Sequence, residues 1–302
     1  MKQYCATGLF ATFLFGLSVL VESGETPPAQ KPTYVGSEVC KACHASQFEA
    51  FSQTLMGRIF LKSPRNDLEK QACENCHGPG GEHVARGGGK GVAVVAFRKD
   101  SPQSVAEQNA ACLQCHERGS RVFWKGSPHE SRDLSCTSCH RIMVKVSDKN
   151  QFAKETEIET CSQCHLQKRA QLMRSSHMPL REGKMTCTDC HNPHGTATEK
   201  LIKANSVNEV CYACHTEKRG PFLWEHAPVR ENCLNCHEPH GSNHDKLLKV
   251  ARPRLCNRCH VEQFHPTTPQ LPSSRFVFNR SCQNCHAQIH GSNHPAGVRF
   301  QR

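Results

Sequence analysis

The clearest apolar run in the sequence lies near its N-terminus. Lys2 is followed by an apolar stretch over residues 9–21, and residues 22–32 are polar and rich in proline. This order is typical of a secretory signal peptide, and the run is short and wrongly flanked for a stable membrane span. We therefore expect residues 1–23 to be a cleaved signal peptide and residues 24–36 to form a flexible N-terminal segment.

Beyond residue 36, the polar and apolar positions predict short helices. Three segments carry the capping-box pattern Ser/Thr-x-x-Glu, which is typical of a helix start. They begin at Ser104, Thr156 and Ser206. Phe48, Phe51 and Leu55 fall on one face of a further predicted helix. The glycine-rich residues 87–91 indicate a loop, so we expect a mostly irregular chain with short α-helices and little or no sheet.

Each capping box leads into a copy of the string Cys-x-x-Cys-His, which occurs ten times. Two thiols at this spacing, followed directly by a histidine, are the attachment pattern of c-type haem. The thiols form thioether bonds to the haem and the histidine ligates its iron. The cysteines are Cys40, Cys43, Cys73, Cys76, Cys112, Cys115, Cys136, Cys139, Cys161, Cys164, Cys187, Cys190, Cys211, Cys214, Cys233, Cys236, Cys256, Cys259, Cys282 and Cys285, and the histidines are His44, His77, His116, His140, His165, His191, His215, His237, His260 and His286. We expect ten covalently bound haem c groups, and hence a multihaem cytochrome c.

The remaining cysteine use agrees with haem attachment. The chain has 21 cysteines, and only Cys5 lies outside the motifs, within the predicted signal peptide. A lipid anchor on Cys5 is disfavoured because a lipidated cysteine should follow the apolar run. Structural zinc sites need four ligands closed into a tetrahedron, so ten three-ligand strings in an exported chain fit zinc poorly.

Composition indicates that haem replaces much of the usual protein core. The chain is only 37% hydrophobic, with 6% aromatic residues. With roughly 28 residues per haem at interior packing density, porphyrin edges must lie within a few ångströms of one another. The formal charge of +11 does not indicate nucleic-acid binding, because the propionates of ten haems offset it by about −10 in the oxidised state.

From Cys136 onward the motifs repeat as two-haem units. The first motif of a unit begins at Cys136, Cys187, Cys233 and Cys282, and the second begins at Cys161, Cys211 and Cys256. The sequence between the motifs also repeats: the strings CTDCHNPHG, KLIK and CYACH are followed later by the similar strings CLNCHEPHG, KLLK and CNRCH. Such a period is typical of stacked units that mainly contact their neighbours. We expect an elongated haem wire built of repeated modules.

The sixth iron ligands separate a closed electron carrier from an enzyme with an open haem. Ten histidines lie outside the motifs, which matches ten haems: His83, His129, His177, His194, His226, His240, His244, His265, His290 and His294. Position within the repeat predicts a different set of ligands. In this set Met56 and Met143 occupy two positions where the other repeats have a candidate histidine, and His244 and His294 have no place in the repeat. We favour the set from the repeat, which predicts His83, His129, His177, His194, His226, His240, His265, His290, Met56 and Met143 as metal ligands.

Some of these candidates lie too close to a motif to serve its own haem. His194 and His240 follow a motif histidine by three residues, and His290 by four. Such a side chain does not easily reach the opposite face of the same haem. We therefore expect these histidines to ligate a neighbouring haem and to tie the repeats together. Ligation by methionine would raise the reduction potential of the haem concerned.

Residues 220–248 (GPFLWEHAPVRENCLNCHEPHGSNHDKLL) and 282–297 (CQNCHAQIHGSNHPAG) resemble the MtrA/DmsE family of periplasmic decahaem cytochromes, and the similarity spans nearly the whole chain from Ser37. The resemblance implies two joined five-haem modules divided between His165 and Cys187, which we place at residues 37–170 and 171–302. Met56 and Met143 depart from the family, whose members commonly offer histidine there.

The resemblance also implies partners. Family members insert into an outer-membrane β-barrel of the MtrB type and connect a periplasmic or inner-membrane cytochrome donor to an extracellular multihaem cytochrome or reductase. We expect a periplasmic, non-enzymatic electron carrier associated with the outer membrane through such a barrel. Two alternatives stay open: a multihaem reductase with one open haem, although no motif replaces its histidine by lysine, and a soluble or filament-forming carrier without a barrel.

Overall fold

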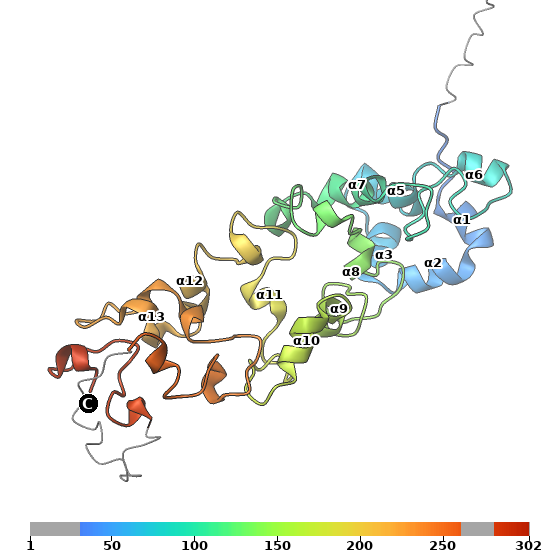
Figure 1. Ribbon diagram of the computed structural model, residues 1–302. Coiled ribbons are helices and arrows are strands. Elements are labelled where there is room, and N and C mark those ends of the chain that lie inside the picture. The colour runs from blue at the N-terminus through green and yellow to red at the C-terminus, as the bar shows by residue number, and fades with distance from the viewer. Residues whose placement is uncertain (1–30, 261–280, 302) are drawn as a thin grey trace, which may run out of the picture. The chain divides into compact units, whose positions relative to one another are not determined.

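The computed structural model describes residues 31–260 and 281–301. Within these ranges the secondary structure is helical, and Figure 1 shows short helices joined by irregular segments. The α-helices are α1 (Ser37–Cys43), α2 (Ala45–Ser52), α3 (Leu55–Lys62), α4 (Asp67–Lys70), α5 (Cys73–His77), α6 (Gly81–Ala85), α7 (Val105–His116), α8 (Cys136–Cys139), α9 (Glu157–Ser162), α10 (Leu166–Leu172), α11 (Cys187–Cys190), α12 (Val207–Tyr212) and α13 (Ala227–Glu231). The 3₁₀ helices are η1 (Gly119–Arg121), η2 (Glu130–Arg132), η3 (Glu199–Leu201), η4 (Thr216–Lys218), η5 (Cys233–Asn235), η6 (Asp245–Leu247), η7 (Cys256–Arg258), η8 (Cys282–Asn284) and η9 (Gly297–Arg299).

No β-strand occurs in the described ranges, where isolated bridges are the only β-type pairing. The prediction of short helices without a sheet is therefore confirmed for these residues. The described residues from Thr33 onward belong to one unit. The predicted signal peptide lies outside the described residues, and the division into two five-haem modules stays a prediction.

The capping boxes start helices at the predicted places. The Ser104 hydroxyl accepts from the Glu107 amide at 3.2 Å at the start of α7, and the Ser104 amide donates to the Glu107 carboxylate at 2.7 Å. Thr156 makes the same pair of bonds at the start of α9. Ser206 accepts from the Glu209 amide at 3.2 Å at the start of α12. Each cap satisfies orphan amides of the first turn and so fixes where the following haem motif begins.

The predicted stripe of Phe48, Phe51 and Leu55 is wrong at its last member. The chain turns after α2, and the Thr54 hydroxyl starts α3 by accepting from the Gly57 amide at 3.0 Å. Phe51 is buried, but Leu55 is 57% exposed. The turn is close because a Cβ on Gly57 would lie 1.8 Å from the Phe51 carbonyl oxygen.

Side chains supply little of the core. The buried hydrophobic residues among those described are Phe51, Phe60, Ala72, Trp124, Leu172 and Leu248. The one apolar cluster they form joins Phe51, Phe60 and Ala72, with Met56 and Ile142 packed against it. A chain of this length normally buries far more apolar surface. The sparse core agrees with the expectation that haem fills the space between the short helices.

Candidate functional site

Every Cys-x-x-Cys-His string forms a single helical turn. Outside helices α5 and α7, which contain two of the motifs whole, the motif histidine amide donates to the carbonyl of the first cysteine at 2.8–3.1 Å. Both thiols and the imidazole are therefore carried by one rigid turn. This common geometry suits a group that is held covalently at two points and ligated at a third.

The even-numbered motifs, counted along the chain, share a hydrogen bond that orients the imidazole. The Nδ1 atom of each motif histidine lies against a backbone carbonyl further along the chain. The pairs are His77 with Val95 at 2.7 Å, His140 with Asn150, His191 with Lys200 and His237 with Lys246 at 2.8 Å, and His286 with Arg299. Because Nδ1 donates to the carbonyl, Nε2 keeps its lone pair for a metal.

The carbonyl is delivered by a repeated tight loop. Asn150–Gln151, Lys200–Leu201 and Lys246–Leu247 each place two consecutive residues at φ of +50° to +59°. Residues other than glycine adopt this left-handed conformation at an energetic cost. Bridges between His140 and Phe152, His191 and Ile202, and His237 and Leu248 close the three loops. The recurring KLIK and KLLK strings thus hold His191 and His237 in place.

Six motif histidines face a second histidine at a nearly constant separation. The ring centroids lie 6.1–6.3 Å apart in the pairs His44–His83, His140–His194, His165–His129, His191–His240, His237–His290 and His260–His226. An imidazole nitrogen lies about 2 Å from a first-row metal and its ring centroid about 1.1 Å further, so two imidazoles on opposite sides of one metal have centroids about 6.2 Å apart. These six sites therefore fit haem iron held between two histidines.

The trailing histidines reach back to the preceding repeat. His194 lies three residues after His191, yet its ring stacks at 10° on that of His140. The same backward step pairs His240 with His191 and His290 with His237. A histidine close in sequence to one motif therefore contacts the motif histidine of the preceding repeat.

A glycine after each of these histidines makes the step possible. Gly195, Gly241 and Gly291 have φ of +113°, +140° and +129°. A Cβ on Gly195 would lie 2.1 Å from the Phe123 carbonyl oxygen, and one on Gly241 would lie 2.0 Å from that of Gln171. Only glycine allows the backbones of neighbouring repeats to approach this closely.

The histidines that precede a two-haem unit are hydrogen-bonded to the segments that carry the trailing histidines. His129 Nδ1 lies 2.7 Å from the carbonyl oxygen of Pro193, the residue before His194. His226 Nδ1 lies 3.0 Å from that of Ile289, the residue before His290. One segment thus positions two candidate ligands, a histidine of its own and a histidine of the repeat before it.

Burial favours the neutral, metal-binding form of several of these side chains. It lowers the pKa of His194 and of His290 to about 4, and it also lowers the pKa of His226 and His240. Neutral imidazole is the form that ligates a metal. His177 differs, because its Nε2 hydrogen bond to Glu182 at 3.1 Å raises the pKa of the imidazole.

Several predicted ligands are not brought to a motif histidine. Within the described ranges His177 contacts Glu182 and not a motif histidine. Among the described residues, the motif histidines His116 and His215 have no second imidazole in ring contact. His265 lies outside the described residues. His177 lies ten residues before Cys187, whereas His129 and His226 lie seven before their motifs, and this longer spacing is a sequence signal for the different position.

The two methionines occupy different surroundings. Met56 packs against the Phe51–Phe60–Ala72 cluster, which Cys76 of the second motif also contacts. Met143 is 40% exposed. The leftover histidines, His244 and His294, each donate a backbone amide to a serine hydroxyl at 3.0 Å. Axial ligation by either methionine stays a prediction.

Consecutive motifs are neighbours through alternating cysteines. Within each odd–even pair, the first cysteines lie close enough for one thiol to shift the pKa of the other: Cys40–Cys73, Cys112–Cys136, Cys161–Cys187, Cys211–Cys233 and Cys256–Cys282. From each even motif to the next odd one, burial raises the pKa of the second thiol, and the second thiol of the next motif adds to the rise: Cys76–Cys115, Cys139–Cys164, Cys190–Cys214 and Cys236–Cys259. Neighbouring cysteines therefore link all ten motifs in chain order.

Buried polar side chains tie the two motifs of a pair together. Asn109, one helical turn before Cys112, accepts from the Cys136 amide at 2.8 Å and donates to the Leu134 carbonyl at 3.1 Å. Asn208 accepts in the same way from the Cys233 amide at 2.7 Å. These bonds hold the first cysteine of one motif beside that of the next.

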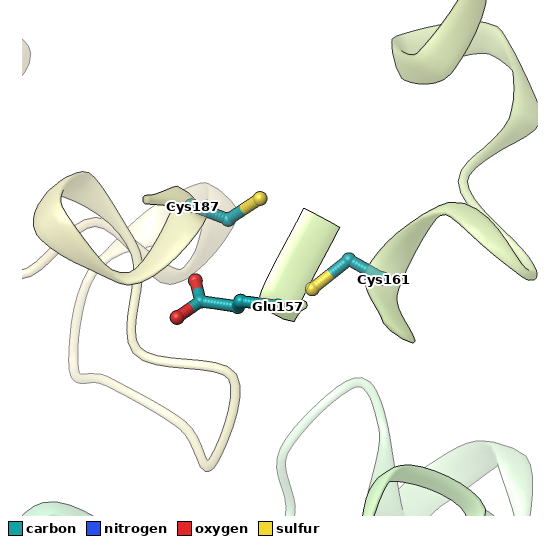
Figure 2. A group of neighbouring side chains, drawn as sticks. All are labelled: Glu157, Cys161 and Cys187. Atoms are coloured by element: carbon teal, nitrogen blue, oxygen red, sulfur yellow. The ribbon is translucent and has the colours of Figure 1, made fainter. Parts of the chain in front are cut away.

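At the fifth and sixth motifs a carboxylate takes this place (Figure 2). Glu157 in α9 accepts from the Thr188 amide at 2.7 Å and from the Thr188 hydroxyl at 2.9 Å. A carboxylate oxygen of Glu157 and the sulfurs of Cys161 and Cys187 all lie within 4.8 Å of one another. Because both thiols belong to haem motifs, we assign this group to haem attachment rather than to a separate metal site.

Across the described ranges, no helix is both long and apolar enough to cross a bilayer. Family comparisons agree with the haem motifs. A model of the doubled CXXCH motif matches residues 177–220 and 226–265, and a model of NrfB-like c-type cytochromes matches residues 73–164.

Curated relatives cover more of the chain. It is 43% identical over 276 residues to the multihaem cytochrome MtrA of Shewanella baltica, covering 88% of this chain and 81% of that protein. It is 28% identical over 149 residues to the cytochrome c-type protein NrfB of Haemophilus influenzae, covering 43% and 64% respectively. It is also 24% identical over 223 residues to the polyhaem cytochrome OmcB of Geobacter sulfurreducens, covering 67% and 26%.

Proposed function

The chain belongs to the MtrA family of multihaem c-type cytochromes, and we propose that it is a decahaem electron conduit. Covalently bound haem c and electron transfer follow from the family and the motifs. The proposal adds three points. Ten haems are bound, they form one row in chain order, and the row carries electrons between periplasmic carriers and the cell exterior.

The unbroken series of neighbouring cysteines is the observation that carries this proposal. Each thioether sulfur lies one vinyl-derived carbon from the porphyrin edge, so neighbouring thiols bring two porphyrin edges close to each other. Because every consecutive pair of motifs has such neighbours, an electron can pass from the first motif to the tenth without a moving part. Haem supplies one-electron oxidation and reduction of its iron.

We assign the axial ligands from the repeat. The motif histidine is one ligand at every site, and His83, His194, His129, His240, His290 and His226 are the second ligands of the first, fourth, fifth, sixth, eighth and ninth haems. By the same pattern His177 serves the seventh haem, Met143 the second and Met56 the third, and His265 is the ligand left for the tenth. Bis-histidine ligation closes the iron to substrates, which suits a carrier.

A barrel partner follows from the physics of the bilayer. The described residues are polar and irregular, and such backbone cannot face lipid. A row of haems that crosses the outer membrane therefore needs a protein sheath. We propose a β-barrel of the MtrB type, with a periplasmic or inner-membrane cytochrome as donor and an extracellular multihaem cytochrome or reductase as acceptor.

The test is electron transfer across a vesicle membrane. Lipid vesicles contain the barrel and the holoprotein, with reduced methyl viologen inside and ferric citrate outside. We expect oxidation of the internal dye only when both proteins are present. The matched variant Cys161→Ala with Cys164→Ala removes the fifth haem and should stop transfer, and unchanged transfer by it would contradict a single row.

A second function is favoured by one observation. His116 and His215 have no second imidazole in ring contact among the described residues. If Met56 or His177 does not ligate, that haem is open and could reduce a nitrogen or sulfur oxyanion. A high-spin ferric signal in the intact protein, together with binding of nitrite to it, would favour the reductase.

A further inference from the structure

The side chains that tie motif pairs together differ in charge. At the third–fourth and seventh–eighth motifs they are the neutral amides of Asn109 and Asn208. At the fifth–sixth motifs it is the carboxylate of Glu157, which lies within 4.8 Å of the sulfurs of Cys161 and Cys187. The chain thus places a carboxylate at one pair where the neighbouring pairs have none.

Glu157 is buried and forms no ion pair with any side chain in the described ranges. The residue is 9% exposed, and none of the ion pairs found among the described residues includes it. Glu69, which is also buried, instead pairs with Arg65 at 2.6 Å. Both oxygens of Glu157 accept hydrogen bonds from Thr188, which is the role of an ionised carboxylate.

On the proposed function, in which Cys161 and Cys187 carry the fifth and sixth haems, we propose that Glu157 lowers the reduction potentials of these two haems. Reduction adds one electron to a haem, and a fixed negative charge nearby opposes that addition. Burial keeps the interaction strong because water and salt screen it little. Glu157 therefore sets a low-potential step in the middle of the row.

The size of the effect follows from Coulomb's law. A unit charge roughly 10 Å from the iron, in a medium of effective dielectric about 20, changes the equilibrium constant for reduction about tenfold. For a one-electron couple a tenfold change equals about 59 mV. The shift should be confined to the two haems attached beside Glu157.

Two reciprocal variants separate charge from tethering. Glu157→Gln removes the charge but keeps an oxygen that can accept from the Thr188 amide. Asn208→Asp adds a charge at the corresponding place of the seventh–eighth pair once its carboxyl group is ionised. It also replaces the amide that donates to the Val229 and Arg230 carbonyls at 3.0 Å, so the titration is run at a pH high enough to ionise it. Glu155→Gln is the matched control, because it removes an exposed carboxylate two residues away.

The measurement is a potentiometric titration of each holoprotein, followed in the Soret band and by electron paramagnetic resonance, with haem content counted by intact mass. We expect Glu157→Gln to raise the reduction potential of one or two haems, with a change of about tenfold in the equilibrium constant for reduction. We expect Asn208→Asp to lower the potentials of the haems at the seventh–eighth pair. No shift in Glu157→Gln beyond that of Glu155→Gln would overturn the inference.

The remaining outcomes are also decisive. A wild-type chain with fewer than ten haems would contradict the proposed function rather than the role of Glu157. If Glu157→Gln loses haems, Asn208→Asp decides alone, and haem potentials that do not fall at a pH where its carboxyl group is ionised would overturn the inference. If Asn208→Asp fails to load haem, Asn109→Asp adds a carboxyl group at the third–fourth pair instead. The inference then requires the reduction potentials of the third and fourth haems to fall.

Discussion

Replacing Gly195 by alanine tests whether neighbouring repeats share axial ligands. Gly195 follows His194, whose ring faces that of His140 at 6.2 Å. An added Cβ would lie 2.1 Å from the Phe123 carbonyl oxygen, so the loop must move by about 1.3 Å to reach ordinary contact at 3.4 Å. Overpacking of this kind costs about 1–3 kcal/mol, and the positive φ of +113° adds about 1–3 kcal/mol for an alanine.

This displacement is more than half the length of an iron–nitrogen bond, which is about 2 Å. We therefore expect Gly195→Ala to release His194 from the fourth haem, which becomes high-spin while the other haems stay unchanged. Near-infrared magnetic circular dichroism of the oxidised holoprotein measures the loss of one bis-histidine haem. Gly183→Ala is the control, because it imposes a positive φ of +67° without any atom within 4 Å of the new Cβ.

An unchanged low-spin spectrum in Gly195→Ala would refute ligation across repeats by His194. A high-spin signal of equal size in the Gly183→Ala control would also count against it, because the effect would then come from backbone strain in general. The expected result is a change in Gly195→Ala alone.

Three further substitutions probe the buried tethers and the methionines. Glu74→Gln should lower the free energy of unfolding by about 1–3 kcal/mol, because the Glu74 carboxylate accepts three backbone amides at 2.8–2.9 Å; thermal unfolding measures this, and an unchanged midpoint would contradict it. Asn109→Ala leaves the Cys136 amide and the Leu134 carbonyl without their partner and should cost about 1–3 kcal/mol for each, whereas a loss below 1 kcal/mol in denaturant titration would show that the tether is unimportant. Met56→Ala should lower one reduction potential, since methionine ligation raises it; an unchanged potential and spectrum would exclude Met56 as a ligand.

The short sequence patterns beside the motifs predict local structure well. The capping pattern at Ser104 and Thr156 starts helices α7 and α9 where expected, because a cap depends only on residues three positions apart. The histidines that follow a motif closely were expected to serve another haem, and His194 does lie against His140. Whether these imidazoles share one iron stays a prediction.

The proximity of cysteines from consecutive motifs could not be predicted. The alternation of first and second cysteines depends on how each turn packs on the next, and no residue spacing records it. The stripe through Leu55 failed because α2 ends at Ser52 and the Thr54 cap starts a new helix, although the apolar spacing is unbroken. The tether by Glu157 joins residues 31 positions apart, and such pairing depends on tertiary structure.

Near-infrared magnetic circular dichroism of the fully oxidised wild-type protein tests the central claim most directly. The account predicts ten low-spin haems per chain, at least six of them with two histidine ligands, and a smaller histidine–methionine component. High-spin iron at several sites, or fewer than six bis-histidine haems, would contradict a closed row that carries electrons from the first motif to the tenth.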